Sequence, residues 1–417
     1  MQIVKIMSFT LLTVSFASTG FAKDVIVRSY EERADYIRSA DTWQKPKWMD
    51  ENLNISDSFD ITKLDVKTEV DALLSNSEEI ACQMTEELAT DISTGTSPKF
   101  KCLVLKLDRA TGAYNLALSK KGKPIKVKVK YRADNNEVVT EVLATRLLRA
   151  LGFTTDRMYP AKTLRCFGCT DDPFKKRTLD TSSLISPRIF TNVAVEQKYD
   201  AEKIEIKEDS FAGAKPTEGW SYHEILGRRS YSADQAEARE QIIERDALIT
   251  IGGVLHHTDD KRANHRLVCD GKVSEEGKCE GNTVIMIQDT GFTFGGQVKS
   301  LDQGKADFSK WKARNVWMGE ENGRSCALNL GMSISMTIPS VTEEGRIFAA
   351  RLLQKLTAGE VGRKRVSDLF KYAGIERADN KSVEQWTELF LSKVAEAAQP
   401  PQGHCRKTVE SVLRKLE

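Results

Sequence analysis

Two short motifs in the second half of the chain have the residue types and the order that phosphoryl transfer requires. Residues 259–264 read Asp-Asp-Lys-Arg-Ala-Asn, and residues 289–291 read Asp-Thr-Gly. In this chemistry one carboxylate orients the attacking group, and an amide and a second carboxylate hold Mg²⁺ on the phosphates of ATP. The order predicts Asp259 as the catalytic base and Asn264 and Asp289 as metal ligands. Lys261 would offset the negative charge that develops on the transferring phosphate.

The elements predicted around these motifs place them on loops beside strands. A helix capped by Ser232 is expected to run to about Leu255, just before Asp259. Short apolar strands are expected at 267–269 and 284–287, so that Asp289 ends the second strand. A glycine at 291 would allow a sharp turn behind Asp289. Two strands flanking a turn would bring the amide and the second carboxylate to neighbouring positions.

Each motif also has an ordinary interpretation. Residues 259–262 could form a solvated charged loop, and residues 289–291 a simple turn. Both motifs in the required order, each at a strand boundary, favour the functional interpretation. Asp260 competes with Asp259 for the role of base, but only Asp259 has an Asn at the fifth following position.

A phosphoryl-transfer site also predicts a lysine held by a helix carboxylate upstream. Alternating apolar residues predict strands at 102–107 and 125–131, and a helix should start at Asp134, with Glu137 completing a capping box, and stop at Gly152. Lys130 near the end of the second strand and Glu141 in the helix have the spacing of such a pair, which would contact the α- and β-phosphates of ATP. Lys128 is the alternative lysine, and an exposed strand face is the ordinary interpretation.

A phosphate-covering loop should precede the first of these strands. Residues 93–100 lie there and include Gly95, Thr96 and Ser97. Backbone N–H groups and hydroxyls of such a segment can hold phosphate without a full glycine-rich motif. Taken alone, the segment is a weak signal and is better interpreted as a plain loop.

These motifs together resemble a group of exported bacterial proteins related to the atypical kinases of the protein-kinase-like superfamily. The superfamily includes the phosphoinositide kinases, HipA-type kinases, spore-coat kinases and secretory-pathway kinases. The resemblance to the bacterial group covers most of 91–397, and the resemblance to proven kinases is confined to the motifs. It implies an α+β, two-lobed protein-kinase-like fold, with a small β-rich N-lobe and a mainly helical C-lobe. It also implies that ATP with Mg²⁺, or Mn²⁺, binds between the lobes near Glu196.

The chain departs from the kinase pattern at several positions. His257-Thr258-Asp259 replaces His-Arg-Asp, the motif at 289–291 replaces Asp-Phe-Gly, and no Ala-Pro-Glu-type activation segment is present. These departures put protein substrates in doubt more than ATP binding. The motifs leave open whether the acceptor is a protein, a lipid or a small molecule, whether a nucleotidyl group is transferred instead, and whether the chain is a catalytically silent pseudokinase.

A metal-dependent hydrolase is a further alternative. His256, His257, Asp259 and Asp260 are a cluster of plausible metal ligands. Their spacing is not that of the His-Glu-x-x-His zinc motif, however. Because the kinase interpretation needs no histidine ligand, it is preferred.

Composition bounds the remaining possibilities. The chain has 417 residues, 29% of them charged, and a formal net charge of +2, which gives no electrostatic argument for a nucleic-acid partner. The first 22 residues have a signal-peptide pattern of Lys5, an apolar run and a small-x-small site ending at Ala22. No later segment reaches membrane-spanning length. The sequence thus predicts an exported protein, periplasmic or secreted, without a transmembrane segment in the mature chain.

The eight cysteines agree with export, since their number is even and none lies in the signal segment. Cys269 and Cys279 bracket a turn-rich stretch and suggest a hairpin disulfide. Cys166 and Cys169 could form a local disulfide, a redox pair or half of a zinc site. A structural disulfide is favoured, because a zinc site would need two more ligands and a thioredoxin-like redox pair would need a βαβ context.

The pattern along the chain gives four parts. They are the signal peptide (1–22), an N-terminal extension with short helices near 66–76 and 77–90 (23–90), the N-lobe (91–198) and the C-lobe (199–417). In the C-lobe, helices are expected at 343–356, 364–372 and 382–397.

Overall fold

The structure is a computed structural model, and it describes most of the chain. The described residues are 25–27, 29–64, 68–75, 78–91, 97–120, 122–135, 137–206, 231–259, 264–296, 306–318, 326–330, 340–400 and 403–415. The predicted signal segment, Gly95, Thr96, Asp260 and Lys261 lie outside these residues.

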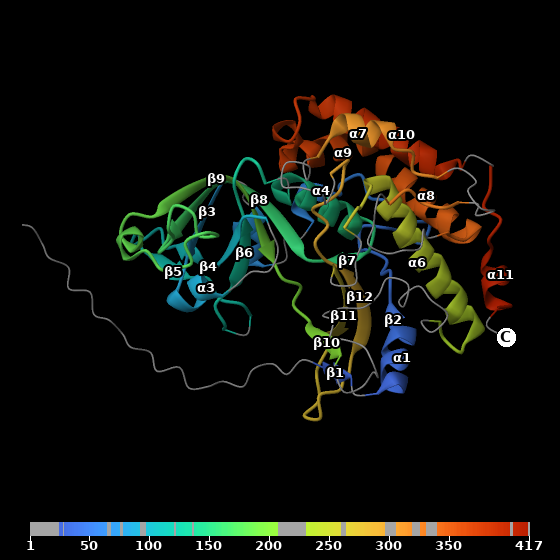
Figure 1. Cartoon of the computed structure of the whole chain (residues 1–417), viewed down its shortest axis with the longest axis horizontal. Helices are drawn as coiled ribbons and strands as arrows, with labels where there is room; N and C mark the ends of the chain where they lie inside the picture. Colours follow the sequence, from blue (N-terminus) through green and yellow to red (C-terminus); the bar gives the residue numbers. More distant parts are fainter. Residues whose placement is uncertain are drawn as a thin grey trace, which may run out of the picture.

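The first part of the fold is a small closed β-barrel (Figure 1). Its strands follow the order β3-β8-β9-β6-β4, and β3 also pairs with β4, which closes the ring. A short strand, β5 (Tyr114–Leu116), extends β4. The five barrel strands are β3 (Glu79–Gln83), β4 (Lys99–Leu107), β6 (Lys126–Lys130), β8 (Arg157–Phe167) and β9 (Arg188–Gln197).

Alternation along the strands separates the inside of the barrel from its outer face. Phe100, Cys102, Val127 and Val129 pack into the buried interior. The residues between them are lysines, which therefore lie on the outer face. This pattern is the one that predicted the strands, and both are confirmed.

One predicted element in the N-terminal extension is wrong. The helix expected over 77–90 is replaced by strand β3 followed by a short helix, α3 (Glu86–Thr90), and the helix near 66–76 is α2 (Glu69–Ser75). Strand β3 is fixed by partners far along the chain, since it pairs with β4 and β8 and carries the Cys82–Cys102 disulfide. Such long-range pairing overrides local helical propensity.

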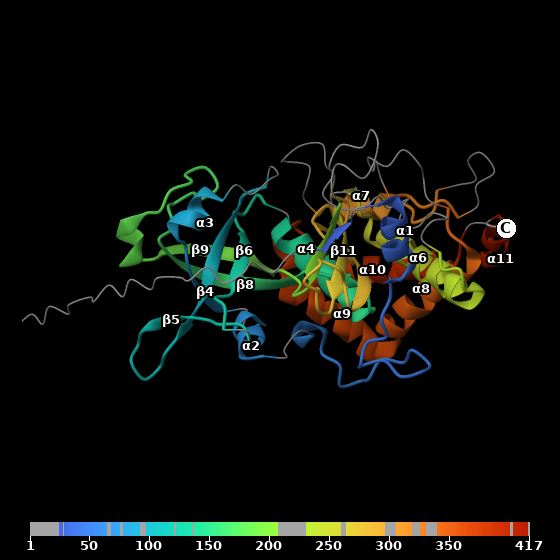
Figure 2. The ribbon, with the colours of Figure 1, turned by 90° about the horizontal axis from the view of Figure 1, so that it is seen from below.

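Helix α4 (Glu137–Ala150) lies between the barrel and the helical part (Figures 1 and 2) and is buried along almost its whole length. Its start differs from the prediction, because Asn135 rather than Asp134 accepts a hydrogen bond from the Glu137 N–H, at 3.2 Å. Its predicted stop is confirmed, since Gly152 follows the helix with φ +97°, a left-handed conformation that suits glycine.

A second sheet lies below α4 and was not predicted as such. Its central strands are β10 (Glu202–Ile206), β11 (His265–Asp270) and β12 (Asn282–Ile287), and its remaining strands come from distant segments: β1 (Val25–Val27), β2 (Ala40–Asp41) and β7 (Thr154–Thr155). Helix α1 (Tyr30–Arg38) stands beside it (Figure 1). The two strands predicted around the cysteine hairpin are β11 and β12.

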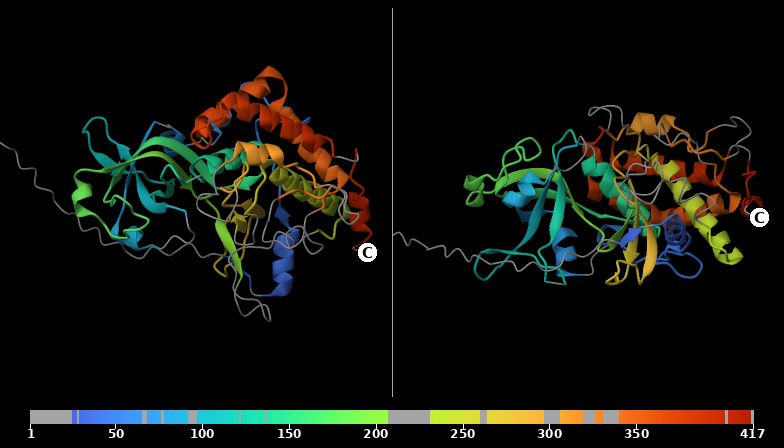
Figure 3. Two further views of the ribbon diagram at one scale, coloured as in Figure 1. Left: turned by 45° about the horizontal axis from the view of Figure 1, so that its top comes forward. Right: turned by 60° about the horizontal axis from the view of Figure 1, so that its bottom comes forward.

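The second half is mainly helical, as predicted, and its helices stack on one side of the second sheet (Figure 3). Helix α6 starts one residue after Asp234, whose carboxylate accepts hydrogen bonds from Ala236 and Glu237, so Asp234 rather than Ser232 is the cap. Trp311, Phe370, Trp386 and Phe390 form the aromatic centre of the core. The helices are α6 (Gln235–Leu255), α7 (Phe308–Ala313), α8 (Glu343–Thr357), α9 (Gly359–Ala373), α10 (Val383–Ala398) and α11 (Val409–Leu413), and 3-10 turns lie at Ile61–Lys63, Thr181–Leu184 and Ile375–Arg377.

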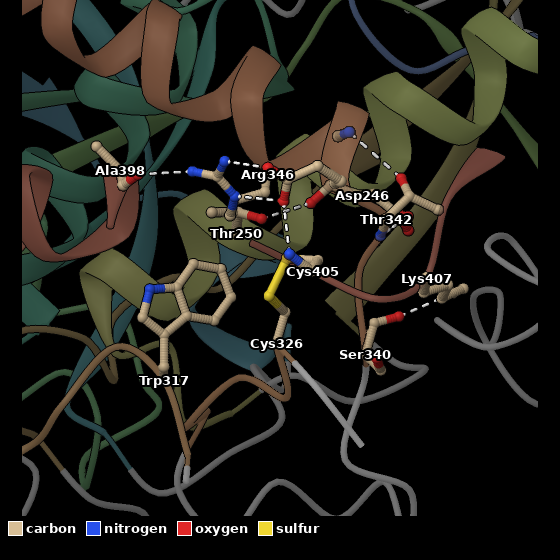
Figure 4. The surroundings of a disulfide bond; sticks show 12 residues. Asp246, Thr250, Trp317, Cys326, Ser340, Thr342, Arg346, Ala398, Cys405 and Lys407 are labelled. Atoms are coloured by element: carbon tan, nitrogen blue, oxygen red, sulfur yellow. Dashed lines mark hydrogen bonds and ion pairs between the residues drawn. A yellow bond between two sulfur atoms is a disulfide. The ribbon is translucent and has the colours of Figure 1, made fainter. Parts of the chain in front are cut away.

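All eight cysteines form disulfides. The two predicted pairs, Cys166–Cys169 and Cys269–Cys279, are present, together with Cys82–Cys102 and Cys326–Cys405. The last ties the C-terminal segment to Cys326 (Figure 4). The Cys405 N–H separately donates to the Glu343 carboxylate at the start of α8, at 2.8 Å. No helix among the described residues combines the length and the apolar character that crossing a membrane demands. The predicted α+β class is confirmed.

Candidate functional site

Lys130, the last residue of β6, is the centre of the candidate site. It is 1% exposed, and its ammonium group forms ion pairs with the carboxylates of Glu137, at 2.6 Å, and Glu141. A third carboxylate, that of Asp289, lies 3.5 Å from the Lys130 nitrogen. The structure thus brings together the strand lysine, the helix carboxylate and the second-motif carboxylate that the sequence singled out, from three separate segments.

The charges in this cluster perturb one another strongly. Burial would lower the pKa of Lys130, but Glu137 and Glu141 outweigh it and raise that pKa well above its usual range. Burial raises the pKa of Glu141 to about 8 in spite of its ion pair with Lys130. For Asp289, burial is outweighed by Lys130 and Lys99, and the pKa is lowered. A buried cluster with perturbed pKa values is typical of functional sites.

The Asp-Thr-Gly turn is built differently from the prediction. Asp289 itself adopts the left-handed conformation, with φ +54°, which is uncommon for a residue with a side chain. Gly291 is needed for close approach rather than for the turn, since a Cβ there would lie 2.5 Å from Cγ of Glu137. The Thr140 hydroxyl donates to the Gly291 carbonyl and fastens α4 to the turn. The left-handed backbone of Asp289 is a form of strain that is often found at functional sites.

Asp259 and Asn264 are joined directly. Helix α6 ends at Leu255, and Asp259 follows four residues later on a buried loop. The Asn264 side-chain amide donates to the carbonyl oxygen of Asp259 at 2.8 Å and to its carboxylate at 3.0 Å. This leaves the Asn264 side-chain oxygen without a hydrogen-bond partner among the described residues.

Main-chain hydrogen bonds tie this loop to the Asp289 turn. The Gln288 N–H donates to the Asn264 carbonyl at 2.8 Å, in register with the pairing of β11 and β12. On the far side of the turn, the Thr258 N–H donates to the Phe292 carbonyl at 2.9 Å. The two acidic motifs therefore occupy neighbouring positions, as the sequence predicted.

The oxygen atoms at this site fit a hard divalent cation. The Asp289 Oδ1 atom is buried and accepts no hydrogen bond, and the amide oxygen of Asn264 is unengaged within the described part of the chain. Carboxylate and amide oxygens are the ligands that Mg²⁺ and Mn²⁺ prefer. Glu137, Glu141 and Asp289 also form a group of three carboxylates whose ligand atoms lie within 4.8 Å of one another.

A second charged network lies at β9, the strand that pairs with β6. Lys128, the alternative lysine, forms an ion pair with Glu196 rather than with α4, at 2.5 Å. Lys198 joins Glu196 to Asp156, and the Gln288 side chain donates to Asp156 at 3.0 Å. Burial opposes ionisation of Glu196, but Lys128 and Lys198 outweigh it and hold its pKa well below the usual range. The network connects the end of β9, where the sequence placed the nucleotide near Glu196, with the residue before Asp289.

The histidines of the hydrolase alternative are not arranged as a metal site in the described residues. His256 has φ +54° at the end of α6, and both of its ring nitrogens are buried without a hydrogen bond to any residue that the structure describes. Burial lowers its pKa to about 4. His257 is buried too, and within the described ranges the clustered ligand atoms are those of the three carboxylates, not of the histidines. Asp260 lies outside those ranges.

Three charged residues of the site were missed by the sequence analysis as site members: Glu137, Asp156 and Lys198. Glu137 carried a signal, because it lies four residues before Glu141 and therefore on the same helix face. Asp156 and Lys198 had no such signal in the sequence, because only tertiary pairing brings them together. Of the predicted phosphate loop, Ser97 is described and is buried directly before β4.

No family description matches the chain, and no curated protein matches it. Two solved structures are similar to it. One is the proinflammatory kinase CtkA of Helicobacter pylori, at 9% identity and a TM-score of 0.39, over 80% of this chain and 96% of that one. The other is the HipA toxin–antitoxin structure of Shewanella oneidensis MR-1, with HipB and operator DNA, at 9% identity and a TM-score of 0.29, over 78% of this chain and 67% of that one.

Two surface pockets lie away from Lys130. Their volumes are about 370 and 330 Å³, and both border Asn192 and Arg377 rather than the carboxylate cluster. The candidate site is accordingly defined by the charges and contacts of its side chains.

Proposed function

We propose that this chain is a kinase-like phosphotransferase that binds ATP with a divalent cation, Mg²⁺ or Mn²⁺, beside Lys130 and Asp289. The observation that carries the proposal is the contact of Lys130 with Glu141 and Asp289. A strand and the helix that follows it supply Lys130 and Glu141, and a turn distant in sequence supplies Asp289. Phosphoryl transfer needs this combination, because catalysis there consists of positioning and electrostatic stabilisation.

Each side chain has a role that its surroundings support. Glu141 would hold the Lys130 ammonium toward the α- and β-phosphates. Asp289 and Asn264 would hold the cation, whose chemistry is to neutralise charge on the phosphates. Asp259, oriented by the Asn264 amide, would accept a proton from the attacking hydroxyl. Lys261, Gly95, Thr96 and Ser97 are proposed to contact the phosphates, and Glu196 to border the nucleotide.

We further propose that the chain is exported, with cleavage near Ala22. Support comes from the signal-peptide pattern and from the four disulfides, which form in oxidising compartments. Mass determination of the N-terminus of the protein from the periplasm or medium tests this proposal. A protein retained in the cytoplasm with Met1 and reduced cysteines would contradict it.

Thermal unfolding with nucleotides tests the proposed function. ATP with Mg²⁺ or Mn²⁺ at 100-fold excess over Kd should stabilise the mature protein by about 2.7 kcal/mol, which is seen as a raised melting temperature. Asp289→Ala should abolish the shift, whereas Glu280→Ala, on the exposed hairpin, should keep it. No shift with any nucleotide and metal pair would overturn the proposal.

The products separate the related activities. Mass spectrometry after incubation with ATP should detect ADP if a phosphoryl group is transferred and diphosphate if a nucleotidyl group is transferred. ATP bound without any product would indicate a pseudokinase.

A further inference from the structure

The outer face of the barrel carries a buried lysine that the proposed mechanism does not use. Lys99 is the first residue of β4, and it pairs in register with Lys130 on β6. Residues opposite each other in an antiparallel pair have side chains on the same face, about 5 Å apart at Cβ. Lys99 therefore lies beside Lys130 on the face that carries the candidate site.

Lys99 differs from its neighbours in having no ionic partner. Lys101 is paired with Asp91, Lys128 with Glu196, and Lys130 with the carboxylates described above. Lys99 is only 9% exposed, yet its ammonium group forms no ion pair or hydrogen bond with any described residue. The Lys99 nitrogen keeps contact with solvent, because it is not one of the buried polar atoms without a partner, so a ligand can reach it. A charge that is largely desolvated and has no counter-ion is costly to the free protein.

The position of Lys99 is fixed by the chain around it. Its preceding residue, Pro98, accepts hydrogen bonds from the Asn135 side chain at 2.9 Å and from the Tyr131 N–H at 3.3 Å. These contacts fasten the entry of β4 to the segment between β6 and α4. Lys99 is therefore held next to the start of α4, where Glu137 contacts Lys130.

The electrostatic surroundings of Lys99 are those of the site. Burial lowers its pKa, and the nearby charges that act on it are those of Lys130, Glu137, Lys128 and Asp289. The adjacent positive charges and the lost solvation both disfavour the ammonium form of Lys99. A bound anion would stabilise that form, and an oligophosphate beside Lys130 and Asp289 has the size and charge to contact it.

We propose that Lys99 is a second cationic contact for the phosphates of the nucleotide, so that the site selects nucleoside di- and triphosphates over nucleosides. The inference rests on the proposed function, because it places a phosphate chain beside Lys130. It extends that function by assigning a binding residue and the ligand feature that the residue recognises.

Calorimetric titration of adenosine, ADP and ATP, each with Mg²⁺, tests the proposal. Lys99→Met should weaken ATP and ADP roughly ten- to hundred-fold, the usual loss of a charge-assisted contact, and adenosine less than two-fold. Lys99→Arg should recover part of the loss. Lys126→Met is the matched control, because Lys126 lies on β6 on the same face of the sheet as Lys99 but is exposed. This variant should bind all three ligands as the wild type does.

Thermal unfolding without ligand provides the second measurement. Lys99→Met removes a partly desolvated charge that lies beside the charge of Lys130, and it should raise the melting temperature of the free protein. A lysine that only balances the carboxylates would behave in the opposite way, and its loss would lower the melting temperature and weaken all three ligands equally. That result would overturn the proposal.

The outcomes also separate this inference from the proposed function. Wild-type binding of ATP that depends on Asp289, together with unchanged binding by Lys99→Met, would overturn only the role of Lys99. A wild-type protein that binds no nucleotide would overturn both.

Discussion

The side-chain amide of Asn264 donates to both the carbonyl and the carboxylate of Asp259, at 2.8 and 3.0 Å. The contact uses both hydrogens of the amide on one residue and turns the amide oxygen away from it. The same Asn side chain can therefore orient a catalytic carboxylate and offer an oxygen to a cation.

Asp259→Asn should separate catalysis from binding. The substituted side chain can still accept from Asn264, so the fold and MgATP affinity should change little, while its loss of basicity should reduce ATP turnover at least about 100-fold. Rates of phosphate release and calorimetric Kd values provide the comparison. Turnover equal to that of the wild type would exclude Asp259 as the base.

Gly291→Ala should disturb the lysine–carboxylate cluster from outside it. The new Cβ would lie 2.5 Å from Cγ of Glu137, so either α4 or the turn must shift, at a cost of about 1–3 kcal/mol. Because Glu137 contacts Lys130, MgATP affinity should fall as well.

A matched glycine in α6 provides the control for this prediction. A Cβ at Gly252 would lie 3.7 Å from Leu330, an ordinary contact, and alanine favours helices over glycine by about 1 kcal/mol. Gly252→Ala should therefore stabilise the protein and leave MgATP binding unchanged. If urea unfolding gave both variants the same stability, the close contact between the turn and α4 would be refuted.

His256 should make stability depend on pH. Burial lowers its pKa from 6.5 to about 4, so the unfolded chain binds a proton more readily than the folded one. Its contribution is fully present above about pH 6.5 and is lost as the pH falls toward 4. Between pH 7 and pH 5 this amounts to about 2 kcal/mol.

His256→Asn isolates this contribution, because asparagine tolerates the left-handed backbone at this position. Burial raises the pKa values of Glu141 and Glu244, which produces the opposite trend in both proteins. The relevant quantity is thus the wild-type minus variant difference in unfolding free energy. It should shrink by about 2 kcal/mol on going from pH 7 to pH 5, and a constant difference would show that His256 titrates normally.

The disulfides should contribute to stability according to the loops that they close. Cys326 and Cys405 are separated by 79 residues, and Cys269 and Cys279 by 10. Loop-closure entropy predicts losses of about 4.5 and about 2.7 kcal/mol for the respective double serine variants. Urea unfolding measures both. The order should reverse only if the C-terminal segment in Figure 4 were held mainly by contacts such as that of Cys405 with Glu343.

Much of the site was predictable because its signals are local. Asn264 directly precedes β11 and Asp289 closely follows β12. Because these two strands pair as a hairpin, the two residues lie near each other, and Asp259 is only five residues before Asn264. Lys130 and Glu141 followed from one strand and the next helix, whose periodicities were clear. Glu137 lies on the same helix face as Glu141, but a single lysine–carboxylate pair does not require a second carboxylate there.

The features that were not predictable depend on long-range pairing. Strand β3 closes the barrel through β4 and β8, and its Cys82 meets Cys102 across the sheet. The network of Asp156 and Glu196 joins Lys128 and Glu196, on two paired strands, to residues that follow or connect other strands. Likewise, position 291 requires glycine because Glu137 of helix α4 packs against it. Sequence rules for turns consider only neighbouring residues and therefore cannot predict this requirement.

Titration calorimetry of ATP into the wild type and into Lys130→Met tests the central claim most directly. The wild type should bind one ATP, and only with Mg²⁺ or Mn²⁺ present. Lys130→Met should bind at least roughly ten-fold more weakly, because it loses a charged contact to phosphate. Binding that is unaffected by Lys130→Met, or no heat with any nucleotide and metal pair, would contradict the assignment of this cluster as a nucleotide site.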